Sequence, residues 1–127
     1  MRRRRRVSSF APETMATIYK ILPANLWRDA VSAGRFRGSP VDLKDGFIHF
    51  SLAGQAPRTA ALHFAGVHDV VIAAFDDSAL GDVRYEPSRG GDLFPHLYGT
   101  LDPKKALWVK PLLLGSDGRH VFPELQP

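Results

Sequence analysis

Glycine and proline divide this chain into short segments, and this division limits its possible folds more than any other feature. The two residue types number 11 and 10 among 127 residues. Because both interrupt regular structure, a plain bundle of long helices is not expected. The longest apolar run, VVIAAF within residues 69–75, is far shorter than the roughly 18–20 residues that a membrane-spanning helix needs. The pattern predicts one small domain of short elements.

The composition excludes several classes of protein. Hydrophobic residues make up 44% and charged residues 24%, which is ordinary globular usage and argues against a wholly disordered chain. Cysteine is absent, so disulfides, thiolate metal sites and a cysteine nucleophile are excluded. We therefore expect a soluble, cytoplasmic protein with no membrane partner.

The basic character of the chain is concentrated before Ala16. Of the 17 basic residues, five are Arg2 to Arg6, and of the 13 acidic residues one is Glu13, so 12 of each sign remain from Ala16 onward. The basic signal thus belongs to a tail and not to a folded binding face. We expect residues 1–15 to be a disordered basic extension preceding a single domain, 16–127. The alternative is a basic arm that contacts RNA or another anionic surface.

The spacing of apolar residues predicts strands or helices for the segments between the glycines and prolines. Alternating or β-branched runs predict six short strands, at 17–22, 47–50, 69–75, 83–86, 96–98 and 107–114. Apolar pairs one turn apart predict a helix of about ten residues ending before Gly34, and a second helix closes at Gly66. Turn-forming residues predict loops at 35–45 and 87–95. An α+β fold with both helices in the first half follows.

The strand FIHFS carries the first candidate site. Side chains alternate along a strand, so Ile48 and Phe50 are expected to face the core while His49 shares the other face with Phe47 and Ser51. The imidazole of His49 and the hydroxyl of Ser51 could then both reach a ligand lying across the strand. The alternative is a half-exposed histidine that bonds a neighbouring carbonyl.

The segment YEPSRGG carries the second candidate site. It places the carboxylate of Glu86, the hydroxyl of Ser88 and the guanidinium of Arg89 directly before Gly90 and Gly91. Arginine forks bind phosphate or carboxylate, and glycines let backbone amides approach an anion closely. The alternative is an internal Glu86–Arg89 ion pair that orders the loop. The segment lacks the GxxxxGK[ST] pattern of a P-loop.

Other polar residues leave two interpretations open. His96 and Tyr98 share one strand face, where they could donate a proton, stack on a base or pack a sheet corner. Arg58 and Thr59 begin a helix, where a phosphate could meet free amides, although a solvent-facing arginine is the simpler interpretation. The remaining histidines are expected to be ordinary surface or core residues: His63, His68 and His120. Because no HxH or HxxxH spacing occurs, no metal site is expected, and the absence of GxSxG argues against a serine hydrolase.

Four segments together resemble the DUF952 family, a family of unknown function. They are IYKILP at 18–23, GSPVDLKDGFIHFS at 38–51, YEPSRGGDLFPHLYG at 85–99 and DGRHVFP at 117–123. The resemblance implies a compact α+β fold of the ADP-ribosylation type, in which a strongly bent, split β-sheet surrounds a cleft. It would bring the FIHFS strand and the SRGG loop near one another.

The resemblance also implies roles for the candidate residues. His49 would hold a ribose hydroxyl, Tyr85, Tyr98 or His96 would stack on a base or nicotinamide, and Arg89 with the Gly90–Gly91 amides would meet a pyrophosphate. Glu86 would orient a transfer, so that His49 and Glu86 are the catalytic candidates. NAD is then expected as a substrate, with no separate cofactor. The chain is thus expected to bind NAD or a related nucleotide and transfer ADP-ribose, or else to be a non-catalytic module for a nucleotide, an RNA end or a protein.

Overall fold

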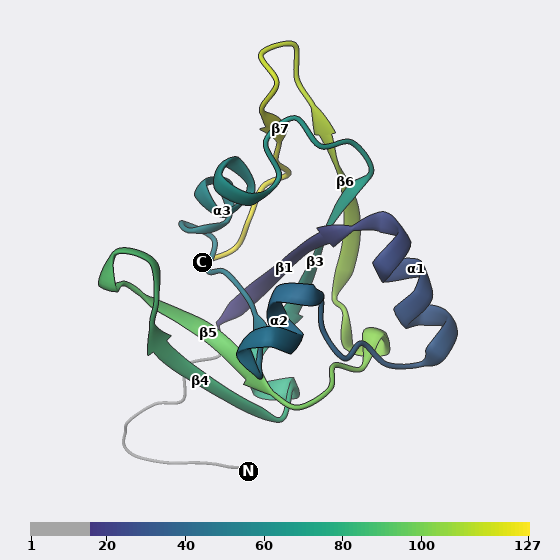
Figure 1. Ribbon diagram of the computed structural model, residues 1–127, viewed down its shortest axis with the longest axis vertical. Helices are drawn as coiled ribbons and strands as arrows, with labels where there is room; N and C mark the ends of the chain where they lie inside the picture. The colour runs from purple at the N-terminus through teal and green to yellow at the C-terminus, as the bar shows by residue number, and fades with distance from the viewer. Residues whose placement is uncertain (1–15) are drawn as a thin grey trace.

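The computed structural model describes residues 16–127 and has an α+β fold (Figure 1). The expected extension at residues 1–15 lies outside the described part of the chain. The helices are α1 (Ala24–Ala33), α2 (Pro40–Asp45) and α3 (Ala56–His63). The strands are β1 (Thr17–Pro23), β2 (Ile48–His49), β3 (Val70–Asp76), β4 (Asp82–Pro87), β5 (Leu93–Tyr98), β6 (Trp108–Leu114) and β7 (His120–Val121).

The strands form two antiparallel sheets. One sheet has the order β1-β3-β6-β7 and the other the order β2-β5-β4. Tyr19 of β1 and Ser51, which follows β2, exchange two backbone hydrogen bonds of 2.8 Å each and so join the sheets at one point. Within residues 16–127 the α+β class is confirmed, with seven strands in two sheets and three α-helices in place of about six strands and two helices.

The main core lies between the two sheets. Ile18 and Phe75 of the larger sheet pack with Ile48 and Leu97 of the smaller one, and all four are at most 1% exposed. Helix α1 covers the same side, where Trp27 meets Phe75 edge-on with ring centroids 6.3 Å apart. The expected core orientation of Ile48 and Phe50 is confirmed. This packing leaves the other face of β2, β5 and β4 for polar side chains.

Helix α3 and the C-terminal segment cover the opposite face of the larger sheet (Figure 1). Ala56 and Ala60 of α3 pack on Tyr19 and Ile72 because alternate residues of β1 and β3 point to this side. The Tyr19 hydroxyl lies 2.7 Å from the Gln126 backbone nitrogen and accepts its hydrogen bond. None of the helices within residues 16–127 is long and apolar enough to cross a membrane.

The prediction of a loop at 35–45 is wrong for its second half, because residues 40–45 form α2. Ser39 and Asp42 form a capping box at the start of this helix, in which the Asp42 carboxylate accepts the Ser39 backbone N–H at 2.8 Å. Gly46 ends the helix with a left-handed conformation, at φ 88°. The prediction of α1 with Gly34 as its left-handed C-cap is confirmed.

Two further boundaries differ from the sequence prediction. The loop predicted at 87–95 contains a 3₁₀ turn at Arg89–Gly91, but β5 already begins at Leu93 and runs through Pro95, whose carbonyl accepts the Phe50 N–H at 2.9 Å. His120 belongs to the short strand β7, which was not predicted and pairs with β6.

Candidate functional site

A row of polar and aromatic side chains occupies the face of the smaller sheet that points away from the core. In the sheet register His49 lies opposite His96, and His96 lies opposite Arg84. Since residues two apart share a face, these three belong to one surface together with their alternate neighbours. We call this surface the histidine face, and its members are Phe47, His49, Arg84, Glu86, His96 and Tyr98.

His49 is held by two carboxylates of α2. Its Nδ1 lies 2.6 Å from Asp42 Oδ1 and its Nε2 lies 2.9 Å from Asp45 Oδ2. Asp42 and Asp45 reach the same ring because residues three apart lie on one side of a helix. Both ring nitrogens therefore have partners, and a ligand reaches Nε2 only by replacing Asp45, whose side chain is 39% exposed.

Asp42 is also paired with a buried lysine. Lys20 Nζ lies 2.9 Å from Asp42 Oδ2, and the two side chains are 6% and 0% exposed. Lys20 also donates to the His49 carbonyl at 2.9 Å. Burial alone would raise the pKa of Asp42, but the His49 hydrogen bond and the Lys20 charge hold this pKa well below its usual range. The Lys20–Asp42 pair fixes α2 against β1 and β2 and so fixes the position of the His49 ring.

His96 and Tyr98 converge on Glu86. Glu86 Oε1 lies 2.8 Å from His96 Nδ1 and accepts the Tyr98 hydroxyl at 2.7 Å. These hydrogen bonds, from His96 first and then Tyr98, lower the pKa of Glu86. Arg84 lies over the Tyr98 ring, with 4.1 Å between its guanidinium carbon and the ring centroid. The result is an ionised, part-exposed carboxylate on the histidine face.

Phe47 packs over the same cluster and buries His96. Its ring stacks on that of His96 with centroids 4.1 Å apart and contacts His49 and Tyr98 at 4.7 and 5.3 Å. His96 is 3% exposed, and its Nε2 is buried without a hydrogen-bond partner within residues 16–127. The hydrogen bond between His96 Nδ1 and Glu86 holds the two side chains in a fixed orientation. Phe47 covers the imidazole of His96 from solvent.

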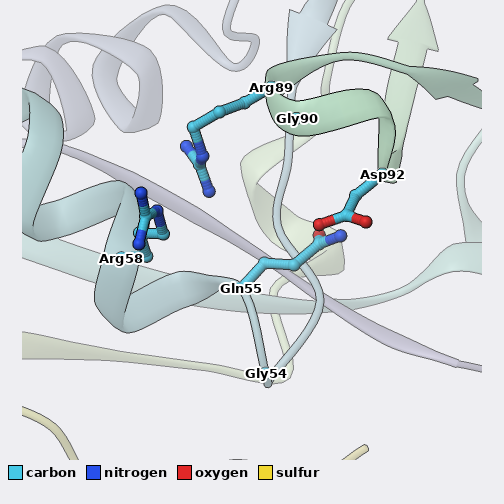
Figure 2. Close-up of a pocket in the computed structure, with 6 residues that line it drawn as sticks. All are labelled: Gly54, Gln55, Arg58, Arg89, Gly90 and Asp92. Atoms are coloured by element: carbon cyan, nitrogen blue, oxygen red, sulfur yellow. The ribbon is translucent and has the colours of Figure 1, made fainter.

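A second group of residues forms a pocket of about 290 Å³ beside the N-terminus of α3 (Figure 2). Arg58 extends into it from α3 and Arg89 from the 3₁₀ turn between β4 and β5. Neither guanidinium forms an ion pair with a carboxylate in the described part of the chain. We call this the arginine pocket, and it is lined by Gly54, Gln55, Arg58, Arg89, Gly90 and Asp92.

The arginine pocket adjoins the histidine face through Arg89. The Arg89 guanidinium lies 4.8 Å from the ring centroid of Phe94, which shares a face of β5 with His96. Arg89 also donates to Thr59 Oγ1 at 3.4 Å, and the Thr59 hydroxyl lies 2.9 Å from Ser51 Oγ. The expected approach of the FIHFS strand and the SRGG loop is therefore present in the fold.

The structure separates the other candidates. Tyr85 lies on the opposite face of β4 from Glu86, and its hydroxyl donates to Asp77 at 2.7 Å, so it does not join the histidine face. Ser88 is exposed beside the pocket. Gly90 and Gly91 have φ values of 68° and 82°, which favour glycine. The alternative Glu86–Arg89 ion pair is not formed, since Glu86 bonds His96 and Arg89 contacts Phe94.

Sequence reasoning missed the α2 carboxylates and Lys20. The S-x-x-D spacing of Ser39 and Asp42 was a usable signal, because it is typical of a helix start. Nothing local marks Lys20, which alternates with apolar residues in a strand. Within residues 16–127, no three histidine or acidic side chains are arranged to hold a metal ion.

Comparison with known proteins places these residues in a family. The family model described as "Protein of unknown function (DUF952)" matches residues 21–109. The chain belongs to the DUF952 family. The match includes all of α2, the histidine face and the arginine pocket.

Solved structures of a similar protein match most of the chain. The crystal structure of protein CC0527 from Caulobacter crescentus has 45% sequence identity to this chain and a TM-score of 0.80. The match covers 84% of this chain and 94% of that one. The solution NMR structure of CC0527 gives 46% identity, a TM-score of 0.74 and coverage of 81% of this chain and 90% of that one. CC0527 is described as a structural genomics target, with no activity or ligand in its name. None of the curated proteins matches the chain.

Proposed function

We propose that this DUF952 domain binds a nucleotide or a related sugar phosphate, with the phosphate in the arginine pocket. The observation that carries the proposal is the meeting of Arg58 and Arg89 in one pocket while neither pairs with a carboxylate in residues 16–127. Two guanidinium groups in one space repel each other, and an anion between them relieves this repulsion. Planar guanidinium forks also match the oxygens of phosphate.

The backbone around the arginine pocket suits the same ligand. Gly90 has no side chain and a positive φ, so the main chain beside Arg89 is open to a close approach. The first turn of α3 contributes the positive end of a helix dipole, which favours an anion. These features act together with the arginines and support phosphate over a carboxylate, since phosphate offers more acceptor oxygens.

In a ligand with two sugars, such as ADP-ribose, one of the sugars would lie toward the histidine face. Arg89 connects the arginine pocket with Phe94 and therefore with the strand that carries His96 and Tyr98. The polar atoms exposed there include the Glu86 carboxylate and, if Asp45 is displaced, the Nε2 of His49. Both are suited to a ribose hydroxyl.

Transfer of ADP-ribose from NAD is the second candidate function, and the ionised Glu86 carboxylate favours it. In such a reaction the glycosidic bond breaks, nicotinamide leaves with the bonding electron pair, and an acceptor oxygen forms the new bond while losing its proton. A fixed carboxylate beside the sugar would stabilise the positive charge that develops on the ribose. This function and the ADP-ribosylation-type fold are implied by the resemblance of the sequence. A non-catalytic nucleotide-binding module is the alternative that needs only the arginine pocket.

The binding proposal is tested by calorimetric titration of the full chain with ADP-ribose and NAD. We expect saturable binding that Arg89→Ala weakens by about 1.5–3 kcal/mol, the contribution of a hydrogen bond to a charged group. Arg28→Ala, an exposed arginine of α1, is the matched control and should leave binding unchanged. An Arg89→Ala protein that binds as tightly as the wild type would show that the arginine pocket is not the site.

The transfer proposal needs a separate measurement, the release of nicotinamide from NAD. Glu86→Gln should abolish release while ADP-ribose still binds. Glu124→Gln, at an exposed position near the C-terminus, is the control. Binding without any release by the wild-type protein would leave the chain as a binding module.

A further inference from the structure

A groove on the other side of Arg58 is larger than the arginine pocket and has a different chemistry. Its volume is about 550 Å³, within the range of small-molecule sites. Ala60 and Ala61 of α3 and Phe122 after β7 give it apolar walls, and Arg119 and His120 add polar groups at its edge. We call it the α3 groove, and its lining is completed by Pro57, Arg58, Ala65, Asp117 and Gly118.

Arg58 lines both the arginine pocket and the α3 groove. The two hollows therefore meet at this side chain, so a ligand whose phosphate lies between Arg58 and Arg89 would have its remaining part beside the groove. The apolar walls of the groove fit a flat ring, whereas the arginine pocket is lined mainly by polar and charged side chains.

The polar groups of the α3 groove suit a nucleobase in particular. Arg119 is exposed and forms no ion pair within residues 16–127, so its planar guanidinium is free to stack on a ring. His120 Nε2 lies 2.8 Å from the Val67 carbonyl oxygen. Because a carbonyl only accepts, Nε2 donates this hydrogen bond, and Nδ1 is the ring atom left for a polar group of a base.

From this arrangement we propose that the α3 groove binds the base of the same ligand whose phosphate occupies the arginine pocket. The ligand class is then a nucleoside phosphate, with its base against Ala61 and Phe122 and its phosphate beyond Arg58. This inference rests on the proposed function, and it places the base on α3 instead of over Tyr98 and His96. In that position the histidine face is left for a second sugar or for an acceptor.

The test compares AMP with ribose 5-phosphate, which lacks the base, by titration of the full chain. We expect AMP to bind at least about tenfold more tightly, because stacking and burial of a base contribute on this scale. Ala61→Trp fills the groove from an exposed helix position and should remove the advantage of AMP while ribose 5-phosphate binds unchanged. Leu62→Trp is the matched control, since Leu62 is 51% exposed on α3 and lines neither hollow.

The outcomes separate this inference from the proposed function. Equal binding of AMP and ribose 5-phosphate, or an AMP advantage that survives Ala61→Trp, overturns the base site and leaves the phosphate site standing. Failure of both ligands to bind the wild-type chain overturns the phosphate site as well. Loss of the AMP advantage in Leu62→Trp would show a general effect on α3 and would also count against the base site.

Discussion

His49 and His96 lie opposite each other on β2 and β5, and each is fixed by a carboxylate from a different element. Their ring centroids are 5.3 Å apart in an edge-on arrangement. Asp42 of α2 binds the Nδ1 of His49, and Glu86 of β4 binds the Nδ1 of His96. The orientation of both rings therefore depends on acidic residues outside their own strands.

Asp42 should be the most sensitive of these residues for stability. Asp42→Ala leaves the buried Lys20 ammonium without its partner and removes the capping box of α2. We expect a loss of about 3–5 kcal/mol in the free energy of unfolding, measured by urea denaturation. Asp82→Ala, which breaks the exposed pair with Arg84, is the control and should cause no measurable change. A stable Asp42→Ala protein would contradict the role given to the buried pair.

The pKa of Asp42 predicts an acid-dependent loss of stability. Since the pKa is depressed in the folded state, the stabilisation is complete above the pKa of the unfolded chain, about 3.9, and is lost as the pH falls toward the folded value. Between these two pKa values the free energy of unfolding should decrease by about 1.4 kcal/mol per pH unit from this group alone. Asp42→Asn should lack this slope. Parallel wild-type and Asp42→Asn curves between pH 4 and 2 would contradict the prediction.

Tyr98→Phe should raise the pKa of Glu86 without unfolding the protein. The variant removes one of the two hydrogen bonds that lower this pKa, while the His96 bond remains. Carbon-detected NMR titration of the Glu86 carboxyl measures the change directly. Tyr85→Phe is the control, because Tyr85 bonds Asp77 on the opposite face. An unchanged Glu86 titration in Tyr98→Phe would mean that the hydroxyl does not stabilise the carboxylate.

Gly38 should tolerate no side chain. Its φ is +131°, and a β-carbon there would lie 2.7 Å from the Cβ of Asp42. Gly38→Ala is therefore expected to cost more than about 1 kcal/mol of stability by displacing the residue that holds His49. Gly81→Ala, at a position with open space and no positive φ, should be neutral or slightly stabilising. Equal melting temperatures for the two variants would refute this account of Gly38.

The local patterns of the sequence predicted the strands and faces well. Alternation in FIHFS placed Ile48 and Phe50 in the core and His49 on the other face, because side-chain direction along a strand is set by the backbone alone. Gly34 was predicted as the C-cap of α1 for a similarly local reason, its freedom to adopt a positive φ.

Features that depend on distant contacts were not predicted. Helix α2 has only six residues, and its Asp42 is buried because Lys20, 22 residues earlier, compensates its charge. Pro95 suggested a loop, yet it lies within β5 between two neighbouring strands. The sequence pattern places Arg58 at a helix start, but only the fold brings its guanidinium group into the same pocket as that of Arg89.

The ligand site is tested most directly by recording nitrogen–proton NMR spectra of the full chain during titration with ADP-ribose. We expect saturable shifts of the backbone amides that line the arginine pocket, at Gly54, Gln55, Arg58, Arg89 and Gly90. These shifts should disappear in Arg58→Ala/Arg89→Ala. The absence of saturable shifts, or shifts confined to residues outside the arginine pocket and its two neighbouring surfaces, would show that this pocket does not bind the phosphate.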